Sequence, residues 1–322
     1  MRGRPKLSVV VPFFNERDNV EPLHEEIVTV MDSLGVPWEV IYVDDGSVDG
    51  TWERIVASRV RHPARVRAVR FRRNFGQTAA LAAGFDRSRG EIVVTLDGDG
   101  QNDPADIPRI LARLEEGYDL MSGWRQDRKD PFATRRLPSR VANWIIGIMT
   151  GVRLHDYGCT LKAYRIEVIR QIALFGEMHR FLPAQASWVG ARIGECAVNH
   201  RPRRTGVSKY GLWRTYRVVL DLITVRFLGS HGTKPLHAFG ALGMVFVLAG
   251  LLTMAALTWM KITTGISFIQ SPLLLLSALF VILGGQSVLL GLLAEISVRT
   301  YYESQGKPIY IVRDDLGGDP DY

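Results

Sequence analysis

Two aspartates separated by one glycine, Asp97-Gly98-Asp99, have residue types and a spacing that could do chemistry. They follow the apolar, β-branched run 92–96, which predicts a strand buried on both faces. Residues two apart on an extended chain point to the same side, so the two carboxylates could share one hard cation. A diphosphate could supply further oxygen ligands to that cation. Taken alone, the motif is more often an acidic turn after a strand.

Polar clusters follow two other predicted strands and could join this pair. Asn15-Glu16 comes after the strand 7–12, and Asp44-Asp45 closes the strand 38–43. The carboxyl ends of parallel strands lie on one edge of a sheet, where ligands bind. Each cluster by itself is more often a turn or helix cap, but together they favour a nucleotide site. No glycine-rich dinucleotide fingerprint follows the first strand, and no Walker-type Lys occurs in the sequence.

Strands and helices must alternate to bring these clusters together, and the sequence predicts that they do so at short spacing. The pattern is typical of an α/β fold with a doubly wound, mostly parallel sheet and right-handed crossovers. The expected strands are 7–12, 38–43, 66–71, 92–96, 118–122 and 193–200. The expected helices are about 19–34, 51–60, 76–87, 104–116, 141–150, one from 166 and one from 178.

Positive charge is concentrated in the first 235 residues, which hold 36 Lys+Arg against 27 Asp+Glu. The remaining residues hold 4 and 6. This excess indicates an anionic partner, and the lack of a basic stripe interleaved with aromatics argues against nucleic acid. Cys159 and Cys196 have no metal-like spacing and fit a reducing compartment. The apolar run 7–14 is short and contains Pro12, so we expect no signal peptide there.

Two uncharged stretches, 238–260 and 272–294, are long enough to cross a bilayer. They predict two transmembrane helices that form an antiparallel hairpin. The connection 261–271 holds one Lys, whereas the outer flanks hold several Lys and Arg. The positive-inside rule therefore places both termini in the cytoplasm, in a multi-pass protein of the inner membrane. Small residues in the stretches would allow close packing within a chain or between chains of a homo-oligomer.

A cationic loop, 201–209, precedes the first of these stretches. The segment 210–228 after it mixes aromatic and aliphatic residues with Arg and Asp, which is typical of a helix on the membrane surface. A core-facing helix would give a similar pattern, but the position before a hydrophobic span favours the interface. The polar stretch 126–136 predicts a mobile loop. The expected organisation is a cytoplasmic catalytic domain at 1–209, an amphipathic juxtamembrane segment at 210–235, the two spans within 236–295 and a cytoplasmic tail at 296–322.

Taken together, these motifs resemble the family 2 glycosyltransferases. Within that family they resemble the polyprenyl-phosphate type, such as dolichol-phosphate mannose synthases and undecaprenyl-phosphate glucosyltransferases. Each motif alone is weak, but the set is specific and covers the chain from Leu7 to about Val312. The motifs are Val-Val-Pro-Phe-Phe-Asn-Glu16, Val-Asp-Asp-Gly-Ser47, Arg-Asn-Phe-Gly-Gln77, Asp-Gly-Asp-Gly-Gln-Asn-Asp-Pro104, Ser-Gly-Trp-Arg125, His-Arg-Phe181, Arg-Thr-Gly-Val-Ser-Lys-Tyr210 and the tail ending in Lys-Pro-Ile-Tyr310.

The resemblance implies a nucleotide-sugar domain of the A type (GT-A) and a set of site residues. By similarity, the base and ribose pocket would be lined by Pro12, Phe14, Glu16 and Asp45. The pair Asp97 and Asp99 would hold Mg²⁺ or Mn²⁺, with Gln101 beside it. Arg125 and Arg136 would reach the donor or acceptor phosphates. A loop carrying Arg201, Arg204, Ser208 and Lys209 would close over phosphate groups.

The implied reaction is inverting transfer of one sugar from a nucleoside-diphosphate sugar to a polyprenyl phosphate of the undecaprenyl type, for glycosylation of the cell envelope. The chain lacks the Gln-x-x-Arg-Trp signature of processive members, which argues for a single transfer. UDP is the first choice of nucleotide, as in UDP-glucose, and GDP, as in GDP-mannose, is the second. Glucose, mannose, N-acetylglucosamine and an aminoarabinose derivative all stay open as the sugar.

The chemistry agrees with this reaction. A lipid monophosphate has a second pKa of ~6 and is already a nucleophile at neutral pH, so the site needs cations rather than a strong general base.

Two other functional classes stay open. One is a non-catalytic membrane protein that binds nucleotide sugars, against which the intact Asp97, Asp99 and Arg125 count. The other is an accessory component of lipid-linked sugar export, against which the uncharged spans count.

Overall fold

The computed structural model describes residues 4–126, 143, 146–148, 150–172, 174, 178–202, 282, 285–286, 289, 293, 296–297, 300 and 309–317. The chain divides into two compact units, Met1–Leu222 with Pro308–Tyr322, and Ile223–Lys307. In the second unit, the described residues between 282 and 300 are helical. No helix within the described ranges has the length and apolar character needed to cross a membrane. The expected loop 126–136 beyond residue 126, the segment 210–228, the span 238–260 and nearly all of the span 272–294 lie outside those ranges.

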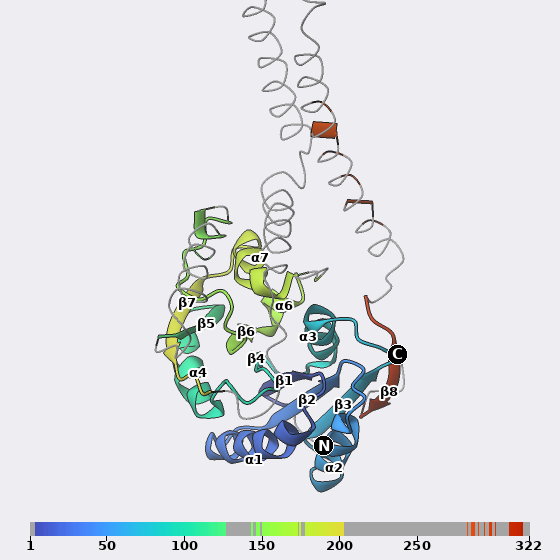
Figure 1. Ribbon diagram of the computed structural model, residues 1–322. Helices are drawn as coiled ribbons and strands as arrows, with labels where there is room; N and C mark the ends of the chain where they lie inside the picture. The colour runs from blue at the N-terminus through green and yellow to red at the C-terminus, as the bar shows by residue number, and fades with distance from the viewer. Residues whose placement is uncertain are drawn as a thin grey trace, which may run out of the picture. The chain divides into compact units, whose positions relative to one another are not determined.

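An eight-stranded sheet forms the centre of the first unit, in the order β7-β5-β6-β4-β1-β2-β3-β8 (Figure 1). Six of these strands run in one direction, whereas β6 and β8 are antiparallel to their neighbours. The expected mostly parallel α/β sheet is therefore confirmed. The strands are β1 Leu7–Phe13, β2 Trp38–Asp44, β3 Val66–Phe71, β4 Ile92–Thr95, β5 Leu120–Arg125, β6 Lys162–Arg165, β7 Ile193–Val198 and β8 Val312–Leu316.

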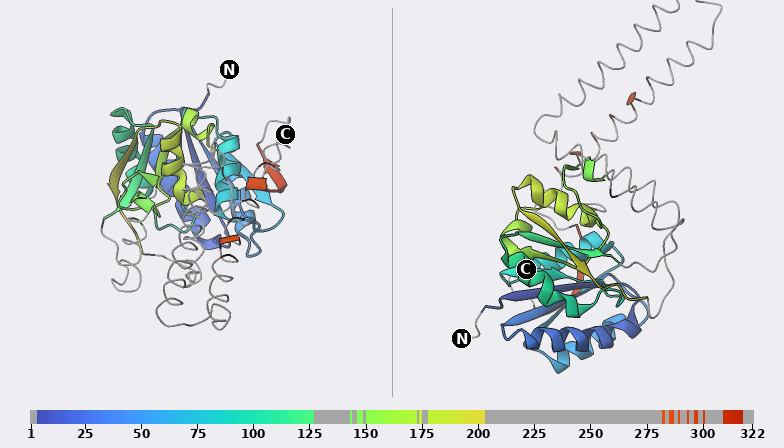
Figure 2. Two further views of the ribbon diagram at one scale, coloured as in Figure 1. Left: turned by 90° about the horizontal axis from the view of Figure 1, so that it is seen from above. Right: turned by 90° about the vertical axis from the view of Figure 1, so that its left-hand side faces the viewer.

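Helices cover both faces of the sheet, with α1 and α2 on one face and α3 on the other (Figures 1 and 2). Val9 and Val11 of β1 belong to the same hydrophobic core as Ile27 of α1 and Ile55 of α2, and all four are fully buried. Full burial of such a side chain contributes about 1.5–3 kcal/mol, so this packing fixes the sheet that carries the site. The helices are α1 Arg17–Ser33, α2 Thr51–Arg61, α3 Gln77–Arg87, α4 Ile107–Glu115, α6 Ile166–Ile169 and α7 Leu182–Trp188, with 3-10 turns η1 Pro104–Asp106 and η3 Met178–Phe181.

Helix α3 packs closely on the sheet, and four of its buried residues are small, namely Ala79, Ala80, Ala83 and Gly84. A Cβ placed on Gly84 would come within 2.2 Å of the side chain of Val10, so no other residue fits there without a shift. This close packing brings the first residue of α3, Gln77, to the carboxyl edge of β1 and β4.

Two elements differ from the expectation in ways that matter for the site. Strand β5 does not stop at 122 but runs to Arg125, because residues 123–125 continue the parallel ladder with β7. No strand was predicted in the cytoplasmic tail 296–322, but Val312–Leu316 forms β8 and pairs antiparallel with β3 (Figure 1). Three of its five residues are charged, so the segment has no apolar strand pattern, and its partner alone makes it a strand.

Candidate active site

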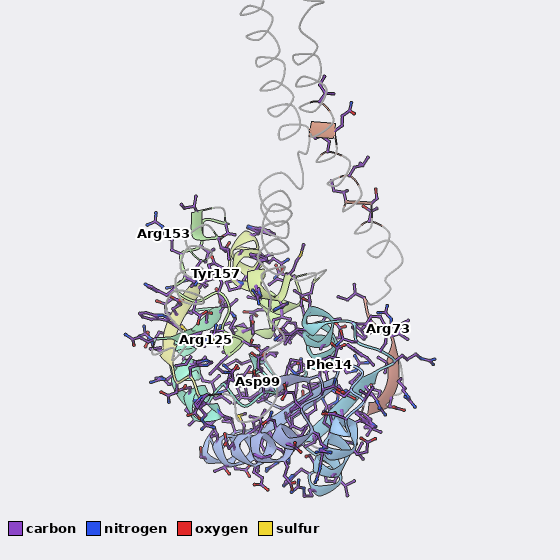
Figure 3. All side chains as sticks on the ribbon, in the orientation of Figure 1. Phe14, Arg73, Asp99, Arg125, Arg153 and Tyr157 are labelled. Atoms are coloured by element: carbon purple, nitrogen blue, oxygen red, sulfur yellow. The ribbon has the colours of Figure 1, made fainter. Side chains whose placement is uncertain are left out.

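The polar clusters predicted to meet do meet, because β4, β1 and β2 are adjacent and parallel. Their carboxyl ends carry the pair Asp97/Asp99, the residue Glu16 and the residue Asp45 to one edge of the sheet. Strand β5 runs in the same direction, so Arg125 at its last position reaches this edge too. Figure 3 marks Phe14, Asp99 and Arg125, which come from the ends of these strands.

The turn after β4 is fixed by glycine and by amide hydrogen bonds. A Cβ on Gly98 would lie 2.5 Å from the ring of Phe13 and 2.6 Å from the carbonyl oxygen of Pro12, so the turn packs directly on β1. The Asp97 N–H donates to Oδ1 of buried Asn102 at 3.0 Å. The turn therefore holds Asp97 and Asp99 in one arrangement at the strand end.

Each of the two carboxylates receives a hydrogen bond that orients it. Nε2 of Gln77 donates to Oδ1 of Asp97 at 2.7 Å, and the Gln101 N–H donates to Oδ1 of Asp99 at 3.1 Å. Carboxylate oxygens suit Mg²⁺ and Mn²⁺, and Mg²⁺ is commonly held by one or two carboxylates together with substrate phosphates. Within the described part of the chain, no group of three or more His, Cys, Asp or Glu could hold a metal ion. The two aspartates alone would leave most of the coordination positions of such a cation to other ligands, and the oxygens of a diphosphate could fill them.

Asp45 holds the loop 72–76, which connects β3 to α3. Its Oδ1 accepts from the Phe75 N–H at 2.7 Å, and its Oδ2 accepts from the Gly76 N–H and from Nδ2 of Asn74, both at 2.9 Å. Burial raises the pKa of Asp45 to about 6, although the hydrogen bonds from the N–H groups of Phe75 and Gly76 oppose the rise. The turn after β2 also packs tightly on the loop, since a Cβ on Gly46 would lie 2.5 Å from the backbone of Arg73. Asp45 thus fixes the conformation of loop 72–76, at the place where the pocket for the nucleotide base was expected.

The loop after β1 is tied to the loop after β2. Asn15 adopts a left-handed backbone with φ 54°, and its N–H donates to Oγ of Ser47 at 2.9 Å. The Glu16 N–H donates to Oγ1 of Thr51 at 3.0 Å, and Oε2 of Glu16 accepts from Nδ2 of Asn19 at 2.6 Å. Two further residues of the expected pocket, Pro12 and Phe14, are half-buried at the same strand end.

Arg125 is locked by a bidentate ion pair. Its Nε and Nη2 donate to the two carboxylate oxygens of Asp156 at 2.7 and 3.0 Å. Burial alone would lower the pKa of Arg125, but the bonds to Asp156 raise it above the ordinary value, with a smaller contribution from the charge of Asp97. Asp156 is held in turn by Glu195 of β7, whose Oε1 accepts its N–H at 3.1 Å. A permanently charged, pre-oriented guanidinium therefore stands at the edge that also carries Asp97.

Two site residues were missed by the sequence reasoning. Gln77 lies within a quoted family motif, so the motif carried a signal that was not used. Lys162, the first residue of β6, is buried, and its Nζ donates to the carbonyl oxygens of Tyr157 and Cys159. Burial lowers its pKa, and the charges of Cys159 and Asp156 oppose that change. A single Lys between Leu161 and Ala163 gives no sequence signal of this placement.

The cationic loop after β7 is described only at its start. The guanidinium of Arg201 donates to Glu26 at 2.6 Å and to Asp103 at 2.7 Å. Its backbone N–H donates to the carbonyl oxygen of Gln101 at 3.0 Å. Arg201 therefore fastens the loop to α1 and to the turn that follows β4; its expected contact with a phosphate stays a prediction. The remaining residues expected to contact phosphates, Arg136, Arg204, Ser208 and Lys209, lie outside the described residues.

The part of the chain that carries this site matches a known protein family. Residues 8–173 match the model described as Glycosyl transferase family 2, and they include every site residue discussed above up to Lys162. The chain belongs to glycosyl transferase family 2. Among curated members, it is 46% identical over 311 residues to the dodecaprenyl-phosphate galacturonate synthase of Rhizobium johnstonii, covering 96% of this chain and 92% of that protein. The resemblance drawn from the motifs is confirmed.

A second relative in this family is the undecaprenyl-phosphate 4-deoxy-4-formamido-L-arabinose transferase of Edwardsiella ictaluri. It is 37% identical over 309 residues, covering 96% of this chain and 93% of that protein. Among solved structures, the glucosyl-3-phosphoglycerate synthase of Mycobacterium tuberculosis, in complex with Mn²⁺, UDP and phosphoglyceric acid, superposes with a TM-score of 0.54. The match is 22% identical and covers 70% of this chain and 78% of the other, so it shows the shared GT-A-type fold.

Proposed function

We propose that this glycosyltransferase moves a single sugar from a nucleoside-diphosphate sugar to a polyprenyl phosphate. The observation that carries the proposal is the gathering of Asp97, Asp99 and a locked Arg125 on one sheet edge beside the Asp45 loop. Both curated relatives are named for polyprenyl-phosphate acceptors, which supports the lipid acceptor. The solved relative was crystallised with UDP and Mn²⁺, which supports UDP ahead of GDP and a divalent metal.

The residues divide the work of the reaction by charge. A divalent metal, when bound by Asp97 and Asp99, would neutralise the departing nucleoside diphosphate. Gln77 and the Gln101 N–H orient those carboxylates before the donor arrives. Arg125 offers a fixed cation to phosphate oxygens, and its charge does not depend on pH in the working range. The acceptor phosphate is largely dianionic at pH 7, so it attacks without a general base. The resemblance to the family implies that this attack inverts the anomeric carbon in one step.

The donor sugar can be identified by assaying a short panel of nucleotide sugars. Galacturonate, which names the relative at 46% identity, puts UDP-galacturonic acid first in that panel. UDP-glucose, GDP-mannose and the formamido-arabinose donor of the second relative follow. A uronic acid would bring another negative charge to the edge that holds Arg125.

The membrane part of the proposal keeps the organisation drawn from the sequence. Residues 1–209 form the cytoplasmic catalytic domain, 210–235 lie at the membrane surface, and 238–260 and 272–294 span the bilayer. A lipid phosphate stays near the headgroup plane, so its ligands must come from the cationic loop next to that plane. The residues proposed for this role are Arg201, Arg204, Ser208 and Lys209, and the ion pairs of Arg201 also anchor the loop.

The deciding experiment incubates the full-length purified protein in detergent with the donor panel, undecaprenyl phosphate, and Mg²⁺ or Mn²⁺. We expect nucleotide release and a glycosylated lipid, detected by mass spectrometry, only when both substrates are present. Asp99→Ala should abolish transfer and metal-dependent UDP binding, whereas Asp18→Ala, an exposed aspartate at the start of α1, should leave both unchanged. Binding without turnover for every donor would favour a non-catalytic nucleotide-sugar protein. Full activity of Asp99→Ala would contradict the metal assignment.

A further inference from the structure

Tyr310, two residues before β8, is a buried anchor between the C-terminal tail and α3. Its ring stacks on Phe71 of β3 with centroids 5.0 Å apart and planes at 18°. Its hydroxyl donates to Oδ2 of Asp86 at 2.7 Å and accepts from Nη1 of Arg87 at 3.1 Å. The side chain is 6% exposed. Because its ring is stacked and its hydroxyl both donates and accepts a hydrogen bond, Tyr310 holds this part of the tail in place.

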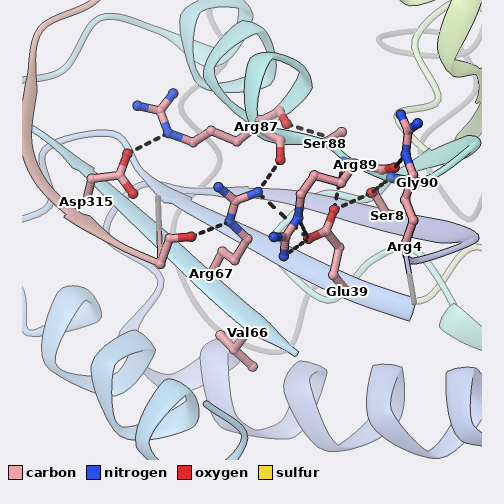
Figure 4. Close-up of polar contacts among 12 residues, drawn as sticks. Arg4, Ser8, Glu39, Val66, Arg67, Arg87, Ser88, Arg89, Gly90 and Asp315 are labelled. Carbon is pink, nitrogen blue, oxygen red and sulfur yellow. Dashed lines mark hydrogen bonds and ion pairs between the residues drawn. The ribbon is translucent and has the colours of Figure 1, made fainter. Parts of the chain in front are cut away.

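Further contacts hold the rest of the tail in register. Nε of Arg87 pairs with Asp315 at 2.8 Å, and Nε of Arg67 donates to the carbonyl oxygen of Gly317 at 2.8 Å (Figure 4). Arg67 also faces the buried carboxylate of Glu39 at 3.8 Å. These bonds lie along β3 and towards the amino end of the sheet. They secure the strand, but none of them touches the edge where the site lies.

Tyr310, in contrast, is connected to that edge through two aromatic rings. Phe71 meets Phe75 edge-on, with centroids 5.7 Å apart and planes at 86°. The N–H of Phe75 donates to Oδ1 of Asp45, and the N–H of Gly76 donates to Oδ2 of the same carboxylate. The ring of Tyr310 therefore supports Phe71, which supports the loop that wraps Asp45.

The backbone makes the same connection. The Arg72 N–H donates to the carbonyl oxygen of Ile311 at 3.1 Å, so the tail is bonded to the first residue of the loop as well. The loop leads straight into Gln77, which orients Asp97 at 2.7 Å. Residues 309–317 thus contact loop 72–76, which lies between Asp45 and Asp97.

We propose that Tyr310 is a positioning residue for nucleotide binding. By stacking on Phe71 it holds loop 72–76 in the conformation that closes around Asp45 and presents Gln77 to Asp97. The inference rests on the proposed function only in taking a nucleoside diphosphate as the ligand of this edge. A tail that merely covers the side of β3 would stabilise the fold without changing the loop or the affinity for the nucleotide.

The test compares Tyr310→Ala with Tyr310→Phe in the full-length protein, with Ile311→Ala as the matched control. Phe keeps the stacked ring, and the Ile311 side chain is 55% exposed while its carbonyl is retained in Ala. Hydrogen exchange of the peptide covering 72–77 and the Kd of UDP with Mn²⁺ are measured for each. Losing one aromatic stack should weaken UDP binding about tenfold and speed exchange in 72–77. Tyr310→Phe and Ile311→Ala should stay near the unsubstituted protein.

The arms of this experiment separate the outcomes. If Tyr310→Ala lowers the melting temperature but leaves exchange in 72–77 and the UDP Kd unchanged, the tail only covers the sheet edge and the proposal is overturned. If the unsubstituted protein does not bind UDP, the proposed function fails, and the exchange experiment still decides whether Tyr310 orders the loop. Should Tyr310→Ala not fold, Tyr310→Leu keeps most of the apolar volume without the stack, and the same two measurements apply.

Discussion

Removing the carboxylate of Asp156 should cost far more stability than removing it together with its partner Arg125. The two side chains are 4% and 14% exposed and share bonds of 2.7 and 3.0 Å. Asp156→Ala leaves the Arg125 guanidinium buried without its acid, and buried Lys162 adds a second cation close by. Breaking one side of a buried pair costs about 3–5 kcal/mol.

For a unit of roughly 200 residues, a loss of 1 kcal/mol lowers the melting temperature by about 2–4 °C. Asp156→Ala should therefore melt about 6–20 °C lower than the unsubstituted protein. The double variant Arg125→Met with Asp156→Ala removes the stranded charge and should recover part of that loss. In a double-mutant cycle the coupling between the two positions should be about 1–3 kcal/mol.

The assay is thermal and urea unfolding of the full-length protein in detergent, combined with the transfer reaction. Transfer should fall about 10²-fold in Arg125→Met, as when one pre-oriented donor is lost. It should not return in the double variant, although part of the stability does. Arg125→Lys, which keeps charge without the planar fork, should retain little of the activity. If the two substitutions add without coupling, the ion pair does not hold this site together. Normal transfer by the double variant would remove Arg125 from the reaction.

Three further outcomes are expected. Asp45 must be ionised to accept its three hydrogen bonds, so UDP affinity should fall as pH drops through about 6, and Asp45→Asn should abolish this dependence. Because its pKa is raised from 3.8 in the unfolded chain, the same group favours folding at low pH, and this contribution disappears as pH rises from about 4 through about 6, opposite in direction to binding. Arg204→Ala and Lys209→Ala should each lower turnover on lipid phosphate about tenfold or more while UDP Kd changes less than in Asp99→Ala; unchanged turnover in both would leave the loop a solvated basic segment. A cysteine at Thr264, with both native cysteines replaced, should react with an impermeant reagent in intact cells, and reaction only after lysis would reverse the topology.

The pair of aspartates after β4 could be found from the sequence because everything that defines it is local. A buried strand, an abrupt end and two acids at i and i+2 occur within eight residues. The meeting of Glu16, Asp45 and Asp97 also followed from sequence, since alternating strands and helices leave few parallel arrangements. These features depend on local patterns, namely the two-residue repeat of strands and the repeat of three to four residues of helices.

The features that sequence reasoning missed depend on distant partners. Arg201 belongs to a cationic loop, and its ion pairs with Glu26 and Asp103 join it to residues 175 and 98 positions away. Strand β8 carries charges at three of five positions and becomes a strand only beside β3. Local propensity carries no information about such pairs, so no periodicity analysis of this chain could have predicted them.

The pairing of β8 with β3 also sets the order in which this enzyme can be built. The bond from Arg67 to Gly317 joins residues 250 positions apart, so the sheet stays incomplete until residues 312–317 have left the ribosome. At about 5–20 residues per second, the chain between residues 222 and 312 takes about 5–20 seconds to synthesise. During that interval the outer side of β3 is an open edge, and its inward-placed Arg67 and Arg70 discourage pairing with other chains. A chain released before residue 312 would therefore lack β8 and leave the outer side of β3 without its partner strand.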